Sequence, residues 1–597
     1  MAEQEKIDLI ISLQRSFEQF REDEANSHLV LVASKQCLDH REITPLVEEL
    51  THCKNMDVLE FVGWELISIM SQDCTSLAES MPLLQEIAER CNPKEVCLGV
   101  VERMDSTHSS EIFISLLPIL QKALTRLKSG RSKFIKMSLP QISSHLGTEK
   151  GRSLNHHVIE ASVSFLDHLV QDVSPLSPVS PDQSTAETTG ENEQAKEALT
   201  KCLVRILGHP LASTHLSTHT SDEMFGKTTD DENHRCHAQA VLGMLGRLQC
   251  QPMNLIEHAS RHPSSYVTHE KLKDGETCIY EGELSLVGLS CYSYLVFVEE
   301  MPCGHIPKVY SNKYLLRINI PHIRCLLART DSHLVFKGLA LLSLLMDRLG
   351  PSSLHHRYLD ICMVQKMAKE LMNVMTLCKA KLLRQRAVKF LPTFLSKLDT
   401  RGRYMLLRCL LSDCAHAGVA SLLIHTIKEE INQSLQTREG DKWFMGSQLI
   451  SLMQTVYKLP PGAGREADLV PETERVMSAL NCLRFILLRD KDDRTSVWAN
   501  LKMIQKEFLE PLGEAVDHTR MNYRKELHDK EHNKGSTERT REDSEINFSV
   551  NTPDGESISM MPREQQCEAL KSGLHALDMM ECILSHIRDI TSSRCRK

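Results

Sequence analysis

Hydrophobic residues recur along most of the chain with the three- and four-residue spacing of amphipathic helices. The segment 418–435 shows the spacing clearly, because its apolar residues fall at steps of three, one and four and so share one helix face. These apolar residues are Ala420, Leu423, Ile424, Ile427, Ile431 and Leu435. Polar residues spaced three or four apart fall on another face, among them His425 and Lys428. The pattern therefore predicts a helix over 418–435.

Comparable amphipathic segments occur in several other places, including 403–413, 447–459, 470–490 and 581–590. Successive helices of roughly 10–20 residues joined by short turns favour antiparallel helix pairs, which stack into α-solenoids. We therefore predict an all-α fold, a HEAT/armadillo-like helical repeat array. A compact helical bundle is the alternative, because no strict repeat is visible, although HEAT-like arrays often lose their sequence repeat.

Three polar segments interrupt the helical pattern. Residues 173–194 are rich in Ser, Pro, Thr and Glu, a composition typical of a disordered loop. A polar stretch around 262–283 suggests a domain boundary, and the charged segment 525–560 suggests a loop between the last two long helices. We expect two helical domains, residues 1–270 and 285–597.

Composition supports helices and argues against several classes of partner. Aromatic residues make up 5% of the chain and apolar residues 41%, a balance that favours helix over sheet. The net charge of −9 argues against nucleic acid as the main partner. The most apolar stretch, 284–298, is shorter than the ~18 residues of a membrane span and predicts a buried helix. The acidic start differs from the basic start of a signal peptide, and we expect the chain to be soluble and cytoplasmic. The 20 cysteines are scattered and form no CxxC motif, so we expect reduced, buried thiols.

Motifs that carry catalytic chemistry are missing from the sequence. The glycine-rich PPGAGRE at 460–466 lacks the lysine-hydroxyl ending of a phosphate-binding loop, and neither GxSxG nor GxGxxG occurs. His234, Cys236 and His237 in HRCH could contact a metal ion, but no second ligand pair stands at structural-zinc spacing. We therefore expect neither an enzyme nor a bound cofactor or metal, and a binding scaffold is the default for a helical array.

Short runs along the chain resemble the glomulin family. Their specificity lies in their number and in their order, which is kept along nearly the whole chain and is densest from about 290 to 490. The runs include CNPKEVCLGVVE (91–102), YLVFVEEM (294–301), RTDSHLVFKGLALL (329–342), KLDTRGRYMLLRCLL (397–411), KWFMGSQLISL (442–452) and MSALNCLRFILLRD (477–490). The resemblance is thin over the first ~30 residues and from about 140 to 270.

The resemblance implies a HEAT-like protein that acts by binding and not by catalysis. Glomulin-type proteins bind the RING domain of the RING-box subunit of cullin–RING ubiquitin ligases. Their C-terminal half covers the surface that would receive the ubiquitin-conjugating enzyme, so ubiquitin transfer is inhibited sterically. The alternative that the resemblance leaves open is an adaptor that associates with FK506-binding immunophilins or a receptor tyrosine kinase.

Lys428 is the first candidate for RING contact. It lies on the polar face of the 418–435 helix, and it aligns with a lysine of the family motif that is associated with RING binding. Arg408, in the preceding helix, and His425, one turn before Lys428, are candidates by proximity. A solvated lysine with a partner four residues away, and polar helix-packing contacts for the other two residues, are the competing interpretations.

Trp443 and Phe444, in the stretch DKWFMG, are candidates of a second kind. They precede a predicted helix with Gly446 or Ser447 as its cap, so they either join two helical hairpins or form a partner-binding hot spot. The remaining candidates for RING contact are Arg484 and Arg588, for which a solvated helix face is the competing interpretation.

Overall fold

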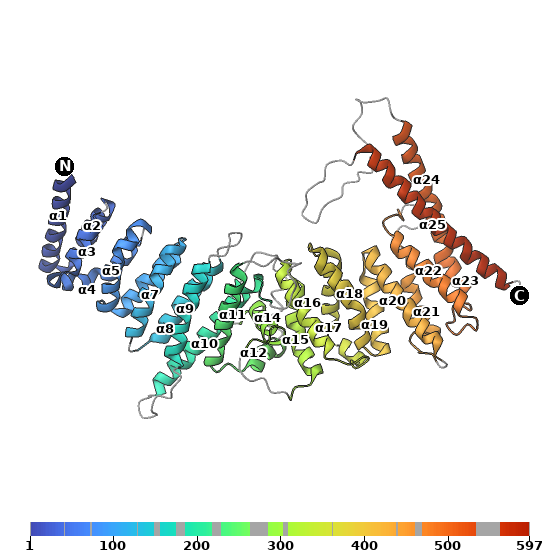
Figure 1. Ribbon diagram of the computed structural model, residues 1–597, viewed down its shortest axis with the longest axis horizontal. Helices are drawn as coiled ribbons and strands as arrows, with labels where there is room; N and C mark the ends of the chain where they lie inside the picture. The colour runs from blue at the N-terminus through green and yellow to red at the C-terminus, as the bar shows by residue number, and fades with distance from the viewer. Residues whose placement is uncertain are drawn as a thin grey trace. The chain divides into compact units, whose positions relative to one another are not determined.

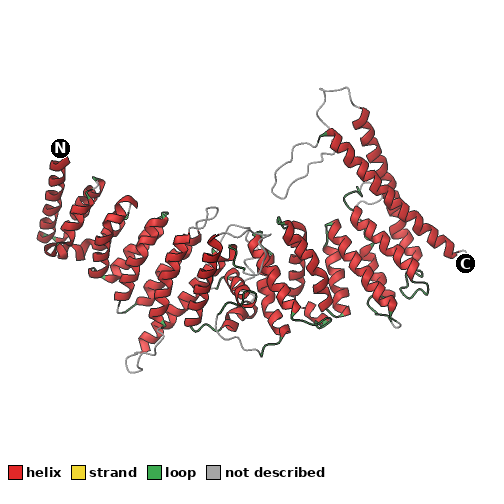
Figure 2. Ribbon diagram, viewed as in Figure 1, coloured by secondary structure: helices red, strands yellow, loops and turns green. Residues whose placement is uncertain are grey.

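The computed structural model contains helices throughout both of its compact units, Met1–Tyr310 and Ser311–Lys597 (Figure 2). It describes residues 2–40, 42–71, 74–127, 129–147, 156–174, 186–217, 229–262, 284–302, 309–360, 362–437, 440–459, 468–532 and 562–595. Within these ranges no strand occurs, and Leu354 and Leu398 form one isolated β-bridge. The prediction of an all-α helical repeat fold is confirmed.

Unit 1 is a two-layered stack of helices (Figure 1). Its helices are α1 (Ala2–Glu22), α2 (Ser27–Asp39), α3 (Ile43–Thr51), α4 (Met56–Met70), α5 (Cys74–Arg90), α6 (Pro93–Ser106), α7 (Ser110–Arg126), α8 (Arg131–Gly147), α9 (His156–Val173), α10 (Ala186–Gly208), α11 (Thr229–Arg247), α12 (Pro252–Arg261) and α14 (Leu286–Phe297). One layer runs α2, α4, α6, α8, α10 and α14, with each helix packed on the next. The other layer runs α3, α5, α7, α9 and α11 in the same manner. This alternation is the packing of an α-solenoid.

Unit 2 continues with helices of similar length and ends in a long antiparallel pair. Its helices are α15 (Asn312–Leu327), α16 (Ser332–Asp347), α17 (Cys362–Leu377), α18 (Lys381–Lys397), α19 (Thr400–Asp413), α20 (Ala417–Gln436), α21 (Gly446–Val456), α22 (Thr473–Arg489), α23 (Leu501–Ile504), α24 (Glu510–His532) and α25 (Arg563–Cys595). Helices α15, α17, α19 and α21 pack in sequence, α20 packs on α22, and α22 packs on α25. Helices α24 and α25 lie side by side (Figure 1). Arg520 joins this pair, since its guanidinium contacts Asp578 at 3.1 Å.

Several helices start at residues whose side chains cap the first turn. Asn92 accepts a hydrogen bond from the Lys94 amide and is followed by Pro93 at the first helical position of α6. Asp331 and Asp399 cap α16 and α19 with side-chain carboxylates that accept backbone N–H donors. These caps satisfy amides that the first helical turn leaves without partners, so the starts of these three helices are set by the local sequence.

The structure places three boundaries differently from the sequence analysis. The division between units falls at 310/311, so α14 belongs to unit 1 although the sequence analysis assigned it to a domain spanning 285–597. Packing explains this, because α14 lies against α10 and α12. The loop expected over 173–194 is helical from Ala186 onward, and the loop expected over 525–560 is helical up to His532. In each case the polar sequence extends a helix whose other turns are buried, and the remaining loop residues, 175–185 and 533–560, lie outside the described ranges.

The core explains the apolar stretch and the buried cysteines, whereas Cys236 and Cys582 are exposed, contrary to the expectation of buried thiols. Helix α14 is buried from Gly288 to Phe297, as predicted for the apolar run 284–298. Burial raises the pKa of Cys97 to about 12, and the Cys97 thiol behaves as a small apolar side chain. Of the helices that the structure describes, none combines the length and apolarity required for a membrane span.

Candidate partner-binding surface

Lys428 lies in the seam between α20 and α22. Its Nζ is 5.9 Å from the ring centroid of Phe485 on α22 and 3.6 Å from the Glu429 carboxylate, and its side chain is 27% exposed. The two helices are also joined by a 2.7 Å hydrogen bond between the hydroxyls of Ser421 and Ser478. The polar face predicted for this helix therefore packs against α22 through polar contacts, and the Lys428 ammonium lies over the Phe485 ring.

His425 and Arg408 are both exposed. His425 lies one turn before Lys428 on α20. Arg408 lies on α19 and lines a surface cavity of about 370 Å³ together with Leu359, Gln365 and Tyr404. Both side chains are accessible to a partner.

Trp443 and Phe444 pack against α19 in two different ways. Phe444 is fully buried and meets the ring of Tyr404 edge-on, with centroids 6.0 Å apart. Trp443 is partly exposed; its ring centroid lies 5.3 Å from that of Tyr404, and the guanidinium of Arg401 lies 5.1 Å from the tryptophan ring. Lys442 Nζ is 5.6 Å from the centroid of the same ring. We call Arg401, Tyr404, Lys442 and Trp443 the Trp443 cluster.

The turn before α21 differs from the predicted cap. Met445 is the N-cap and makes no side-chain capping bond, whereas the sequence analysis placed the cap at Gly446 or Ser447. Gly446 has a φ of +58°, a backbone conformation that favours glycine, and α21 begins there. Asp441 holds the turn instead, because its carboxylate accepts the Trp443 amide at 2.9 Å and its carbonyl accepts the Phe444 amide at 3.1 Å.

Arg484 and Arg588 have distinct surroundings. Arg484 on α22 is partly buried, and its Nε has no hydrogen-bond partner among the described residues, so a solvated face does not describe it. Arg588 on α25 is exposed and lies over α24, where a Cβ added to Gly513 would be 3.2 Å from its Nη2. Four of the seven candidates contact a neighbouring helix, and they do so in separate places: Lys428 contacts α22, Trp443 and Phe444 contact α19, and Arg588 lies over α24.

A largely buried ion pair joins α19, which carries Arg408, to α20, which carries His425 and Lys428. Arg403 Nε on α19 lies 2.9 Å from Glu430 Oε1 on α20, and both side chains are 14% exposed. Burial raises the pKa of the Glu430 carboxyl, and the nearby Arg403 charge offsets part of that rise. Removing Arg403 would leave a carboxylate unpaired in the interior, so the pair constrains how α19 meets α20.

One cluster in unit 2 has the composition of a metal site but serves another purpose. His355, His356 and Asp399 bring their potential ligand atoms within 4.8 Å of one another. The Asp399 carboxylate, however, accepts the Gly402 amide at 2.7 Å and contacts His356 Nδ1 at 2.9 Å. Its oxygens are engaged in capping α19, and we assign the cluster a structural role.

Sequence reasoning missed the partners of Trp443. Arg401 and Tyr404 stand three residues apart in RGRYMLL and share a face of α19, and Lys442 precedes the tryptophan directly. The spacing of Arg401 and Tyr404 was visible in the sequence, but the sequence of one helix does not tell which other segment it contacts. The structure shows that Trp443 packs against this face of α19.

The fold and this surface define a helical repeat protein of the α-solenoid class. The chain belongs to the family described as "Uncharacterised protein family, YAP/Alf4/glomulin", whose profile matches residues 1–571. Glomulin from Mus musculus is 28% identical over 98% of this chain and 97% of that protein. Glomulin from Homo sapiens is 28% identical over 94% of this chain and 93% of that protein.

A solved structure, "Circular tandem repeat protein with novel repeat topology and enhanced subunit contact surfaces", aligns with 88% of this chain and 99% of that chain. Its sequence identity is 14% and its TM-score 0.22, so it adds nothing to the fold described above.

Proposed function

We propose that this chain is a non-enzymatic inhibitor of cullin–RING ubiquitin ligases. It binds the RING domain of the RING-box subunit through unit 2 and covers the site of the ubiquitin-conjugating enzyme. The observation that carries the proposal is family membership along residues 1–571, a span that includes every candidate except Arg588. Two glomulins match nearly the full chain, which supports a shared mode of action over a resemblance confined to one repeat.

Steric masking requires a surface and no catalytic group. A specific interface buries about 1,600 Å² in total, with a few aromatic or arginine anchors that dominate its energy. The Trp443 cluster has this composition, since two exposed cations, Arg401 and Lys442, lie 5.1 Å and 5.6 Å from the ring centroid of a partly exposed indole. Exposed Arg408 lies one turn beyond Tyr404 on the same helix and adds a cation at the rim. Rim cations steer a charged partner and raise its association rate.

The proposal is tested by ubiquitin-chain formation on a neddylated cullin–RING ligase with the full-length chain as inhibitor. The wild-type chain should co-elute with the RING-box subunit and slow chain formation in competition with the conjugating enzyme. Arg401→Glu should weaken both effects, whereas Lys35→Glu, an equal charge reversal at an exposed side chain on α2 of unit 1, should change neither. Failure of the wild-type chain to bind the RING-box subunit at micromolar concentration would refute the proposal.

The same assay separates the adaptor alternative. An adaptor for FK506-binding immunophilins would bind an immunophilin in an FK506-sensitive manner and leave ubiquitin transfer unchanged. That combination of results would replace the inhibitor proposal.

A further inference from the structure

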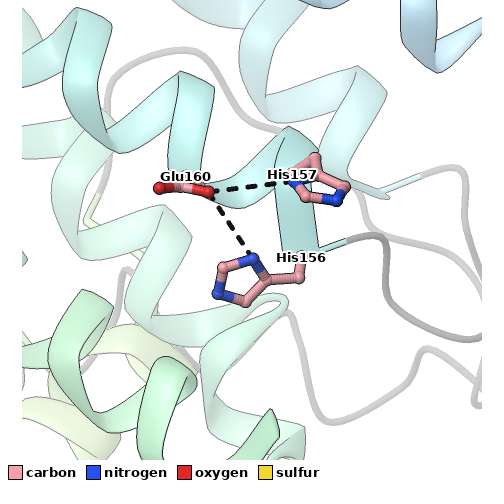
Figure 3. Close-up of side chains that lie close together, drawn as sticks. All are labelled: His156, His157 and Glu160. Atoms are coloured by element: carbon pink, nitrogen blue, oxygen red, sulfur yellow. Dashed lines mark ion pairs between the residues drawn. The ribbon is translucent and has the colours of Figure 1, made fainter.

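The first turn of α9 in unit 1 gathers two imidazoles and a carboxylate (Figure 3). His156 Nδ1 lies 3.6 Å and His157 Nδ1 3.9 Å from Glu160 Oε2. The potential ligand atoms of all three residues lie within 4.8 Å of one another. Residues four apart share a helix face, which explains why His156 and Glu160 meet.

These separations match the edges of a metal coordination shell. Zinc bonds nitrogen and oxygen ligands at ~2.0–2.2 Å in a tetrahedron, which places neighbouring ligand atoms ~3.3–3.6 Å apart. The distance from His156 to Glu160 falls at the upper end of this range, and that from His157 is slightly longer. Small side-chain rotations would bring the ligand atoms of these three α9 residues to the required separations.

Helix α11 packs on α9 and supplies a second pair of histidines. The His237 ring centroid lies 4.9 Å from that of His156. His234 and His237 are 7% and 9% exposed. His237 Nδ1 and both ring nitrogens of His234 are buried without a hydrogen-bond partner among the described residues. Buried polar atoms without partners are costly, so this arrangement points to a ligand that accepts nitrogen lone pairs.

We propose that His156, His157 and Glu160 of α9, together with His237 of α11, bind a divalent transition-metal ion of the zinc type. Three imidazole nitrogens and one carboxylate oxygen suit zinc and its neighbours, whereas calcium and magnesium favour all-oxygen sites. His234 lies one turn before His237 on the same helix and is also buried. The ion would join the start of α9 to α11 within unit 1.

HRCH by itself did not predict a metal site, because no second ligand pair stands at structural-zinc spacing in the sequence. The structure supplies that pair from HHVIE, at the start of a helix far earlier in the chain. The contrast with His355, His356 and Asp399 sharpens the assignment, since there the carboxylate already caps α19. In the α9 cluster Glu160 is not an N-cap, and its side chain is 61% exposed.

The test uses the full-length chain without an affinity tag, stripped with a chelator and then titrated with Zn²⁺ against a competing chromophoric chelator. Wild-type protein should take up one Zn²⁺ per chain in a saturable step, and Co²⁺ should give the visible spectrum of a tetrahedral site. Glu160→Gln and His237→Gln should each weaken Zn²⁺ affinity by more than ~10-fold. Substituting a residue that only hydrogen-bonds to a metal ligand already costs at least about this much, and these substitutions remove the ligands. His355→Gln is the matched control and should leave uptake unchanged.

Two outcomes would overturn the proposal. One is the absence of saturable uptake by the wild-type chain. The other is equal Zn²⁺ affinity in wild type and Glu160→Gln, which would assign any uptake to scattered surface histidines. Because the Glu160 side chain is largely exposed, its substitution leaves the fold intact and decides the matter even where His237→Gln lowers the melting temperature of the metal-free chain.

Discussion

Lys428 rests on the ring of Phe485, with Nζ 5.9 Å from the ring centroid, and this contact joins α20 to α22. Burial raises the pKa of the Cys482 thiol to about 12, and the nearby positive charge of Lys428 opposes this rise. The lysine that the family resemblance selects for RING contact is therefore part of the helix seam. Its substitution is expected to affect folding as well as binding.

Lys428→Gln should lower the free energy of unfolding by about 0.5–1 kcal/mol, because it removes the cation from the Phe485 ring. The measurement is a double-mutant cycle with Phe485→Leu, followed by urea unfolding. We expect a coupling energy of the same size between the two positions, since each substitution removes the same interaction. Additive effects would mean that the lysine is simply solvated.

Trp443 and Phe444 should differ in what they contribute. Phe444→Ala opens a cavity in a fully buried site and should cost ~3–5 kcal/mol. Trp443 is partly exposed, so Trp443→Ala should cost less than Phe444→Ala in the same unfolding measurement. If Trp443 is also a partner anchor, Trp443→Ala will weaken RING-box binding by more than its loss of stability explains. The comparison is made with Trp443→Phe, which keeps a ring against Tyr404.

The helices were predictable because their periodicity is strong. The helix predicted over 418–435 is α20, Ala417–Gln436, and the segments 403–413 and 447–459 correspond to α19 and α21 within a few residues. Each has an apolar face that must be buried, and this face can be recognised from the periodicity of that segment alone.

The contacts between helices were not predictable in this way. Trp443 meets Tyr404, and His156 meets His237, although each pair lies on different helices. Which helices meet depends on turn geometry and on the crossing of neighbouring repeats, and single-helix periodicity is silent on both. The polar start of α10 was missed for a related reason, since packing by its later turns supports a stretch whose composition favours a loop.

Asp399 should make the stability of unit 2 depend on pH in the acid range. Burial of its carboxyl opposes ionisation, but hydrogen bonds from His356 and from the His356 and Gly402 amides outweigh it and lower the pKa. The folded pKa lies below the unfolded value of about 3.9, so the stabilisation is fully present above that pH and is lost as pH falls through the folded pKa.

Asp399→Ala should therefore cost about 1–2 kcal/mol near neutral pH, the usual size for loss of an N-cap. The difference in urea midpoint between wild type and Asp399→Ala should shrink when the measurement is repeated below about pH 4. A difference that stays constant across this range would show that the carboxylate charge does not contribute.

Gly288 allows α14 to approach α10 in unit 1. A Cβ at this position would overlap the carbonyl oxygen of Val204 and lie 2.8 Å from its carbonyl carbon, so backbone would have to move. Gly288→Ala should destabilise unit 1 by about 3 kcal/mol or more, at or beyond the upper end of overpacking costs.

Gly243 on α11 is the control, because a Cβ there meets nothing within 4 Å. Gly243→Ala should raise stability by about 0.5–1 kcal/mol through helix propensity. Opposite shifts in melting temperature would confirm the α10–α14 contact, and equal shifts would contradict it.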